Sequence, residues 1–142
     1  MMNILTHNSG VVKKRESVFI EVTICNTDAS DSVPMYKLKP QISVPVEIVR
    51  IADSGHKLPA GWTIISNDGA TIRFSNGTDI IPLAQCRTVF IAVTGKNPGG
   101  PLTVSGNLSF SNGLAPGSMP GGPTIRDNPA DNNSTSTCKV IN

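Results

Sequence analysis

Residues 17–25 read Ser-Val-Phe-Ile-Glu-Val-Thr-Ile-Cys, and the aliphatic side chains recur at every second position. These side chains share one face: Val18, Ile20, Val22 and Ile24. The other face carries Phe19, Glu21, Thr23 and Cys25. Such alternation is typical of a β-strand that is buried on one side, because successive side chains of a strand point to opposite faces. This stretch decides the class of fold.

The same alternation recurs at residues 42–51, where one face carries Ile42, Val44, Val46 and Ile48. Pro45 interrupts this segment, and proline has no amide hydrogen to donate to a β-ladder. We therefore expect residues 42–51 to form one strand that lies at a sheet edge or carries a bulge.

Turn signals separate the remaining segments. Asn67-Asp68-Gly69 lies between residues 62–65 and 71–74, which are rich in β-branched side chains, and this is a strong signal for a tight hairpin. Further strands are predicted at residues 86–93, 102–110 and 134–141. About seven short strands with turns between them predict an all-β fold, an antiparallel β-sandwich.

The predicted core follows from the aliphatic phase of these strands. We expect the following side chains to point inward: Val18, Ile20, Val22, Val44, Val46, Ile48, Val89, Ile91, Val93, Val104 and Leu108. A register slip of one residue would expose a strand's whole apolar set, so this set tests the register as well as the fold.

Length and charge restrict the classes of function. A chain of 142 residues suffices for one domain with a core and is too short for two. The net charge is +2 and 15% of the residues are charged, which excludes a strongly basic nucleic-acid-binding protein. No apolar run reaches membrane-spanning length, so we expect no direct membrane insertion. The opening residues are too polar for a secretory signal, and we interpret Met1 as a start inside a larger protein.

Several turn motifs occur in a familiar order: residues 58–64, 73–82, 86–88, 106–117 and 127–135. Leu58-Pro59-Ala60-Gly61 precedes one predicted strand, and Asp131-Asn132-Asn133-Ser134 precedes the last. Together these motifs resemble the immunoglobulin-like repeat modules of large surface proteins and adhesins of the Bacteroidetes. They are also similar to the broader family of conserved-repeat surface domains.

The resemblance implies an immunoglobulin-like antiparallel sandwich, export to the cell surface or the extracellular space, and neighbouring modules of the same polypeptide or surface assembly as partners. It begins near residue 18, so we expect a single domain at residues 17–142. Residues 1–16 match no part of the family, and we interpret them as an N-terminal arm or a first edge strand. The family has no conserved catalytic residues to carry over.

The cysteines extend this expectation. Cys25 ends one predicted strand and Cys86 begins another, and both lie off the aliphatic face. In an immunoglobulin-like order these two strands pair antiparallel, which predicts a Cys25–Cys86 disulfide that an oxidising compartment would permit. Cys138 shares its phase with Val140 and is expected to be a small buried apolar side chain. A Cys25–Cys138 or a Cys86–Cys138 bond stays open as an alternative.

Residues 112–133 are rich in Gly, Pro and Asn, and we expect this segment to face a partner. Its Asp127 and Asp131 offer the oxygen ligands that calcium takes, so they are candidate calcium ligands. The alternative is an Asx-rich turn that leads into the last strand. No other cofactor is expected, because the cysteines and the two histidines, which lie in polar, turn-like surroundings, lack zinc-ligand spacing.

We expect no enzymatic activity. The acidic residues are dispersed, and no nucleophile elbow or phosphate-binding loop accompanies them: Glu21, Glu47, Asp53, Asp68 and Asp79. Two functions remain, a structural spacer or adhesive unit of a bacterial surface or secreted protein, and a carbohydrate-binding module appended to a secreted enzyme. The candidate ligands are a glycan and a protein, besides the neighbouring modules.

The two functions differ in what they require of the aromatic side chains. A carbohydrate-binding module needs an exposed row of aromatics on a flat sheet face, yet aromatics make up only 4% of the chain. Phe74 and Phe110 fit core positions, and we expect core or rim packing for most of the others, including Trp62. The sequence therefore favours the spacer or adhesive unit.

Overall fold

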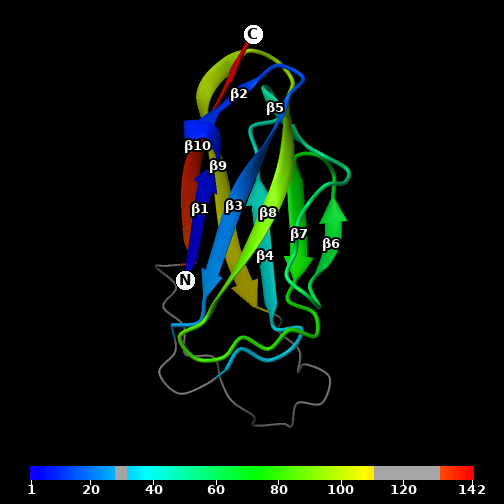
Figure 1. Cartoon of the computed structure of the whole chain (residues 1–142), viewed down its shortest axis with the longest axis vertical. Helices are drawn as coiled ribbons and strands as arrows, with labels where there is room; N and C mark the ends of the chain where they lie inside the picture. The colour runs from blue at the N-terminus through cyan, green and yellow to red at the C-terminus, as the bar shows by residue number, and fades with distance from the viewer. Residues whose placement is uncertain (28–31, 111–131) are drawn as a thin grey trace.

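Two β-sheets pack face to face and enclose the core (Figure 1). The computed structural model describes residues 1–27, 32–110 and 132–142. The strands are β1 (Met2–Thr6), β2 (Val11–Lys13), β3 (Ser17–Cys25), β4 (Leu38–Ser43), β5 (Val49–Ile51), β6 (Thr63–Asn67), β7 (Thr71–Ser75), β8 (Cys86–Gly95), β9 (Gly99–Phe110) and β10 (Asn133–Ile141). A short 3-10 helix, η1 (Asn8–Gly10), separates β1 from β2, and these described residues include no α-helix. The all-β sandwich is confirmed.

The sheets differ in width. One has the order β1-β3-β8-β5 and the other β2-β10-β9-β4-β7-β6. Neighbouring strands run antiparallel in every described pair except β2 and β10, which run parallel. In Figure 1 the four-stranded sheet lies in front of the six-stranded sheet, so the central strands β3 and β8 cover β9 and β4. The core fills the space between these layers.

Most of the predicted core is confirmed, because the alternation of β3 and β8 continues through their whole length. Nine of the eleven predicted side chains are buried: Ile20, Val22, Val44, Ile48, Val89, Ile91, Val93, Val104 and Leu108. Val18 is only partly buried at the start of β3 and packs against the core from there. Val46 is exposed, and the prediction for this residue was wrong.

The error at Val46 has its origin in the segment 42–51, which is not one strand. The chain leaves the six-stranded sheet at the end of β4 and joins the four-stranded sheet at β5. Between them, the carbonyl of Pro45 accepts hydrogen bonds from the amides of Ile48 and Val49. The proline marks the crossing between the two sheets, because the chain there needs no ladder donor.

Residues 1–16 contribute one strand to each sheet. Strand β1 pairs with β3 at one edge of the four-stranded sheet, and β2 pairs with β10 at one edge of the six-stranded sheet. These two strands and the division of 42–51 explain why the described chain has ten strands where the sequence predicted about seven.

The predicted hairpin is present. Strands β6 and β7 pair antiparallel around the turn at residues 67–70. Gly69 adopts a φ of +86°, which side chains with a Cβ rarely reach. The Asp68 carboxylate accepts hydrogen bonds from the amides of Ala70 and Thr71, so the side chain itself closes the turn.

Candidate interaction surface

The disulfide joins the two central strands of the four-stranded sheet. Cys25 and Cys86 are direct partners in the β3–β8 register, and their Cα atoms lie 4.0 Å apart. The predicted Cys25–Cys86 bond is therefore confirmed. Cys138 is a free thiol in β10 with no exposed surface, and burial raises its pKa, which keeps it protonated and unreactive.

The outer face of the four-stranded sheet carries a cluster of three rings, which we call the ring cluster: His7, Phe19 and Phe90. The ring centroids of Phe19 and Phe90 are 5.8 Å apart, and the His7 ring lies 5.8 Å from Phe90 and 6.3 Å from Phe19. All three contacts are edge-to-face. Phe19 and Phe90 point outward because they alternate with the buried aliphatic side chains of β3 and β8.

Charged groups surround the ring cluster. The His7 Nε2 atom lies 2.8 Å from a carboxylate oxygen of Glu21, which is the residue opposite Phe90 in the sheet. The Lys57 ammonium lies 5.2 Å from the centroid of the Phe19 ring, in a cation–π contact. Leu5, 54% exposed, is the β1 partner of Glu21 and adds apolar surface. This mixture of aromatic, apolar and polar groups suits contact with a protein surface.

The remaining aromatics do not form a platform. Trp62 and Phe74 are buried, and the Trp62 indole donates to the Asp79 carboxylate at 2.8 Å. Phe110 is partly buried against the core, while Tyr36 is exposed. In the described part of the chain, the rings that reach the surface of the four-stranded sheet stand edge to face. A sugar ring stacks on a flat aromatic face, so this arrangement does not favour glycan binding.

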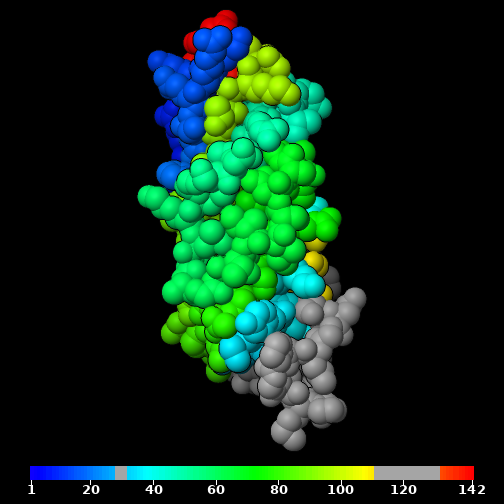
Figure 2. Space-filling model, turned by 90° about the vertical axis from the view of Figure 1, so that its right-hand side faces the viewer, coloured from blue at the N-terminus to red at the C-terminus, as the bar shows by residue number. Residues whose placement is uncertain are grey.

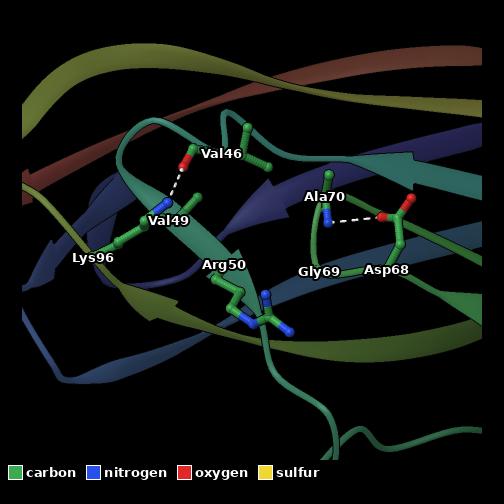
Figure 3. Close-up of a pocket in the computed structure, with 7 residues that line it drawn as sticks. All are labelled: Val46, Val49, Arg50, Asp68, Gly69, Ala70 and Lys96. Atoms are coloured by element: carbon green, nitrogen blue, oxygen red, sulfur yellow. Dashed lines mark hydrogen bonds between the residues drawn. The ribbon is translucent and has the colours of Figure 1, made fainter.

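A small pocket opens beside β5 and the β6–β7 turn (Figure 3). It has a volume of about 130 Å³ and is lined by Arg50, Lys96 and Asp68, with Val46, Val49, Gly69 and Ala70. Its charged groups already have protein partners: Lys96 donates to the carbonyl of Val46, and Arg50 lies 3.6 Å from Asp53. The amides of Thr71 and Ala70 hold the pKa of Asp68 below its usual value. We therefore interpret the pocket as a structural gap between β5 and the β6–β7 turn and not as a binding site.

The other candidate residues occupy separate structural positions. Asp79 forms an ion pair with Arg87 at 2.9 Å near the start of β8. The ring nitrogens of His56 are engaged by the carbonyl of Ala52 and the amide of Ala92. Among the described residues, no three His, Cys, Asp or Glu side chains converge on a possible metal position. Asp127 and Asp131, and the segment 112–131 of the predicted partner-facing loop, lie outside the described residues.

Sequence reasoning missed the ring cluster, although the signal was present. Phe19 and Phe90 lie on the same outward phase as Cys25 and Cys86, so the pairing that predicted the disulfide also predicts that the two rings are near each other. The residues around His7 predict only a polar turn. Its partner Glu21 lies in β3, 14 residues further along the chain, so no local pattern connects the two side chains. Only the β1–β3 pairing brings them together.

None of the described residues forms a helix long and apolar enough to cross a membrane. No family model and no curated protein matches this sequence.

Several solved structures have a similar fold. A cohesin module from a family 33 glycoside hydrolase of Clostridium perfringens superposes with a TM-score of 0.62 at 11% identity, over 98% of this chain and 96% of its own. A protein of Nocardia farcinica with an immunoglobulin-like fold gives 0.54 at 13% identity, over 96% and 98%. A CARDB domain from Pyrococcus furiosus, in complex with di-metal ions, gives 0.53 at 10% identity, over 99% and 85%. At these identities the likeness shows the fold alone: an immunoglobulin-like β-sandwich.

Proposed function

We propose that this domain is a non-catalytic module of a secreted or surface-exposed bacterial protein, where it acts as a spacer and an adhesive unit. The observation that carries the proposal is the Cys25–Cys86 disulfide. Structural disulfides form and persist in oxidising compartments outside the cytosol. The turn motifs that resemble Bacteroidetes surface repeats support the same location.

The placement of the chain ends supports the spacer role. The C-terminus lies at the upper end of the sandwich, and β1 begins on its left side, near the lower ends of the strands (Figure 1). Modules joined through such ends extend along their long axes, with neighbouring modules as partners. The similar cohesin module comes from a glycoside hydrolase, so a sandwich of this fold serves as one part of a larger protein there.

For the adhesive role we propose the ring cluster and its rim as the contact surface, with a protein as the partner. Aromatic side chains, Phe among them, are enriched at protein interfaces, where a polar rim surrounds the apolar centre. The runner-up, a glycan-binding module, has weaker support because Phe19 and Phe90 are edge to face. Absence of catalysis remains part of the proposal, supported by the dispersed carboxylates.

Thiol trapping in the native cells tests the proposal. Cells are lysed in acid, denatured and alkylated, and the cysteine peptides are mapped without reduction. We expect Cys25 and Cys86 in one disulfide-linked peptide and Cys138 alkylated, in protein that external protease removes from intact cells. Alkylation of Cys25 and Cys86, in protein protected from the protease, would overturn the proposal.

A binding experiment separates the adhesive unit from the glycan-binding module. The purified domain is applied to a glycan array, together with a Phe90→Ser variant. We expect no glycan signal above background for either protein. If the wild type binds a glycan and the variant does not, the domain is a glycan-binding module and the proposed adhesive unit is wrong.

A further inference from the structure

We propose that this domain resists tension along its long axis, and that its first and last strands, β1 and β10, carry the force together with β2. The inference rests on the proposed spacer role, since only a module held at both ends is pulled in this way. It adds a mechanical function that the fold and the contacts between these strands support.

The two end strands run side by side along the pulling direction. In Figure 1, β1 begins on the left side near the lower ends of the strands, β10 ends near the C-terminus at the top, and both lie along the long axis. Strand β2, which follows β1 in the chain, pairs in parallel with the last residues of β10: Val11 faces Lys139, Val12 faces Val140 and Lys13 faces Ile141. Pulling the two ends apart therefore slides these strands past one another.

Hydrogen bonds connect β1 directly to β10 across the two sheets. The amide of Ile4 donates to the Ser134 hydroxyl at 3.0 Å, and the amide of Thr6 donates to the Ser136 hydroxyl at 3.2 Å. The Thr6 hydroxyl also donates to Ser136, at 3.1 Å. Thr6 is buried, so water does not readily replace these bonds. The amide of Lys14 continues the connection by donating to the carbonyl of Ile141 at 2.8 Å.

The direction of the force decides how these bonds break. Ladder hydrogen bonds lie across the strands, so a force parallel to the strands loads the whole set at once. A force that lifts one strand from its end loads them one at a time. Forced unfolding follows the unfolding rate, and a barrier that requires several bonds to break together slows that rate.

The disulfide limits how far the domain can lengthen after it yields. Cys25 and Cys86 are separated by 61 positions and belong to β3 and β8, outside the end strands. At about 3.5 Å per extended residue, this loop holds back about 210 Å of chain. A module of this design yields at a high force and releases only part of its length.

Single-molecule pulling on the purified domain tests the inference by comparing two directions. In the first, handles are attached at residues 1 and 142. In the second, they are attached at residue 142 and at a Pro98→Cys substitution, an exposed position before β9. Because Val140 pairs with Gly99, the second direction lifts β10 from β9 starting at one end.

We expect the first direction to need at least about twice the rupture force of the second. Reduction should add about 210 Å to the released length in the first direction. Equal forces in the two directions would overturn the inference, since the same β9–β10 bonds are present in both. This comparison uses no substitution in the end strands, so it does not depend on a variant that folds poorly.

A matched pair of variants locates the resistance. The double variant Ser134→Ala and Ser136→Ala removes the β1–β10 hydroxyl bonds, whereas Ser43→Ala removes a comparable hydroxyl contact to Thr71 between β4 and β7. We expect the double variant to lower the rupture force in the first direction and Ser43→Ala to leave it unchanged. Equal loss in both, or loss in neither, would show that the β1–β10 bonds do not resist the force.

The outcome is separable from that of the thiol-trapping experiment. Weak rupture in the first direction overturns the mechanical inference and leaves the exported module in place. A cytosolic protein with reduced cysteines overturns the proposed function, whatever force the purified domain withstands.

Discussion

The two long sides of the sandwich differ in the hydrogen bonds that hold their edge strands. On one side, β1 is tied to β10 by the Ser134 and Ser136 hydroxyls, and the chain after β2 bonds to Gly95 at the end of β8. We call this the tied side. On the other, the described contacts lie at β5 and the residue after it: the Ile51 amide donates to the carbonyl of Gly69, and the Asn67 side-chain amide donates to the carbonyl of Ala52. Within the described residues, β6 pairs with β7 alone, and this open side faces the viewer in Figure 2.

The difference teaches how exposed strand edges are managed in this fold. In strand β1 the amides of Ile4 and Thr6 donate to side-chain hydroxyls, so they are not free to pair with another chain. Strand β6 has the same length as β1, but its register with β7 shifts between Ile64 and Ser66. Such an irregularity discourages pairing with a strand of another chain. One side is protected by bonds and the other by irregular geometry.

The largest expected loss of stability comes from the disulfide at the centre of the four-stranded sheet. This loss is the standard against which the effects at the two sides are compared. Replacing Cys25 and Cys86 by Ala should lower the free energy of unfolding by about 4 kcal/mol, because the bond closes a long loop in the unfolded chain. Denaturant unfolding measures the loss, and the wild type in reductant should match the variant. An unchanged midpoint in reductant would mean that the bond does not constrain the unfolded chain.

Next, one isoleucine from each side tests whether the tied side belongs to the core. Ile4 in β1 is 4% exposed, and Ile4→Ala should cost about 3 kcal/mol of unfolding free energy. Ile65 in β6 is 53% exposed, and Ile65→Ala should change it by less than about 0.5 kcal/mol. Thermal or urea unfolding of both variants gives the comparison. Similar losses would remove the distinction between the two sides.

A smaller effect is expected from the hydroxyl that ties β1 to β10. Ser136→Ala leaves the amide of Thr6 without this acceptor at a buried position, which should cost about 1–2 kcal/mol. Amide exchange should rise at Thr6 and leave the β6–β7 hairpin unaffected. A uniform rise in exchange across both sides would contradict a local role for the hydroxyl.

The smallest effect concerns the turn of the open side. The amides of Thr71 and Ala70 lower the pKa of Asp68 in the folded state, so its contribution is present above the ordinary aspartate pKa of about 4. It is lost as the pH falls through the lower, folded-state pKa. Exchange or chemical shifts of the Ala70 and Thr71 amides should follow this titration. Asp68→Ala should abolish it; persistence in that variant would assign the titration to another group.

The sequence alone determined the features that depend on local alternation and local turns. The period-two patterns of β3 and β8 identified their buried faces, and Asn67-Asp68-Gly69 located the hairpin, because both signals are written within a few neighbouring residues. The Cys25–Cys86 pair also followed, once an immunoglobulin-like order placed the two strands together. Cys138 shares its phase with Val140, and both are buried in the core, as that phase predicts.

Only the tertiary structure decided where the chain changes sheets and which distant side chains meet. An alternating pattern looks the same on either side of Pro45, so nothing local distinguishes one strand at 42–51 from β4 and β5 in opposite sheets. His7 and Glu21, and Thr6 and Ser136, meet because β1 lies between β3 and β10. Periodicity specifies which face of a strand is buried, whereas the choice of neighbour depends on packing across the whole chain.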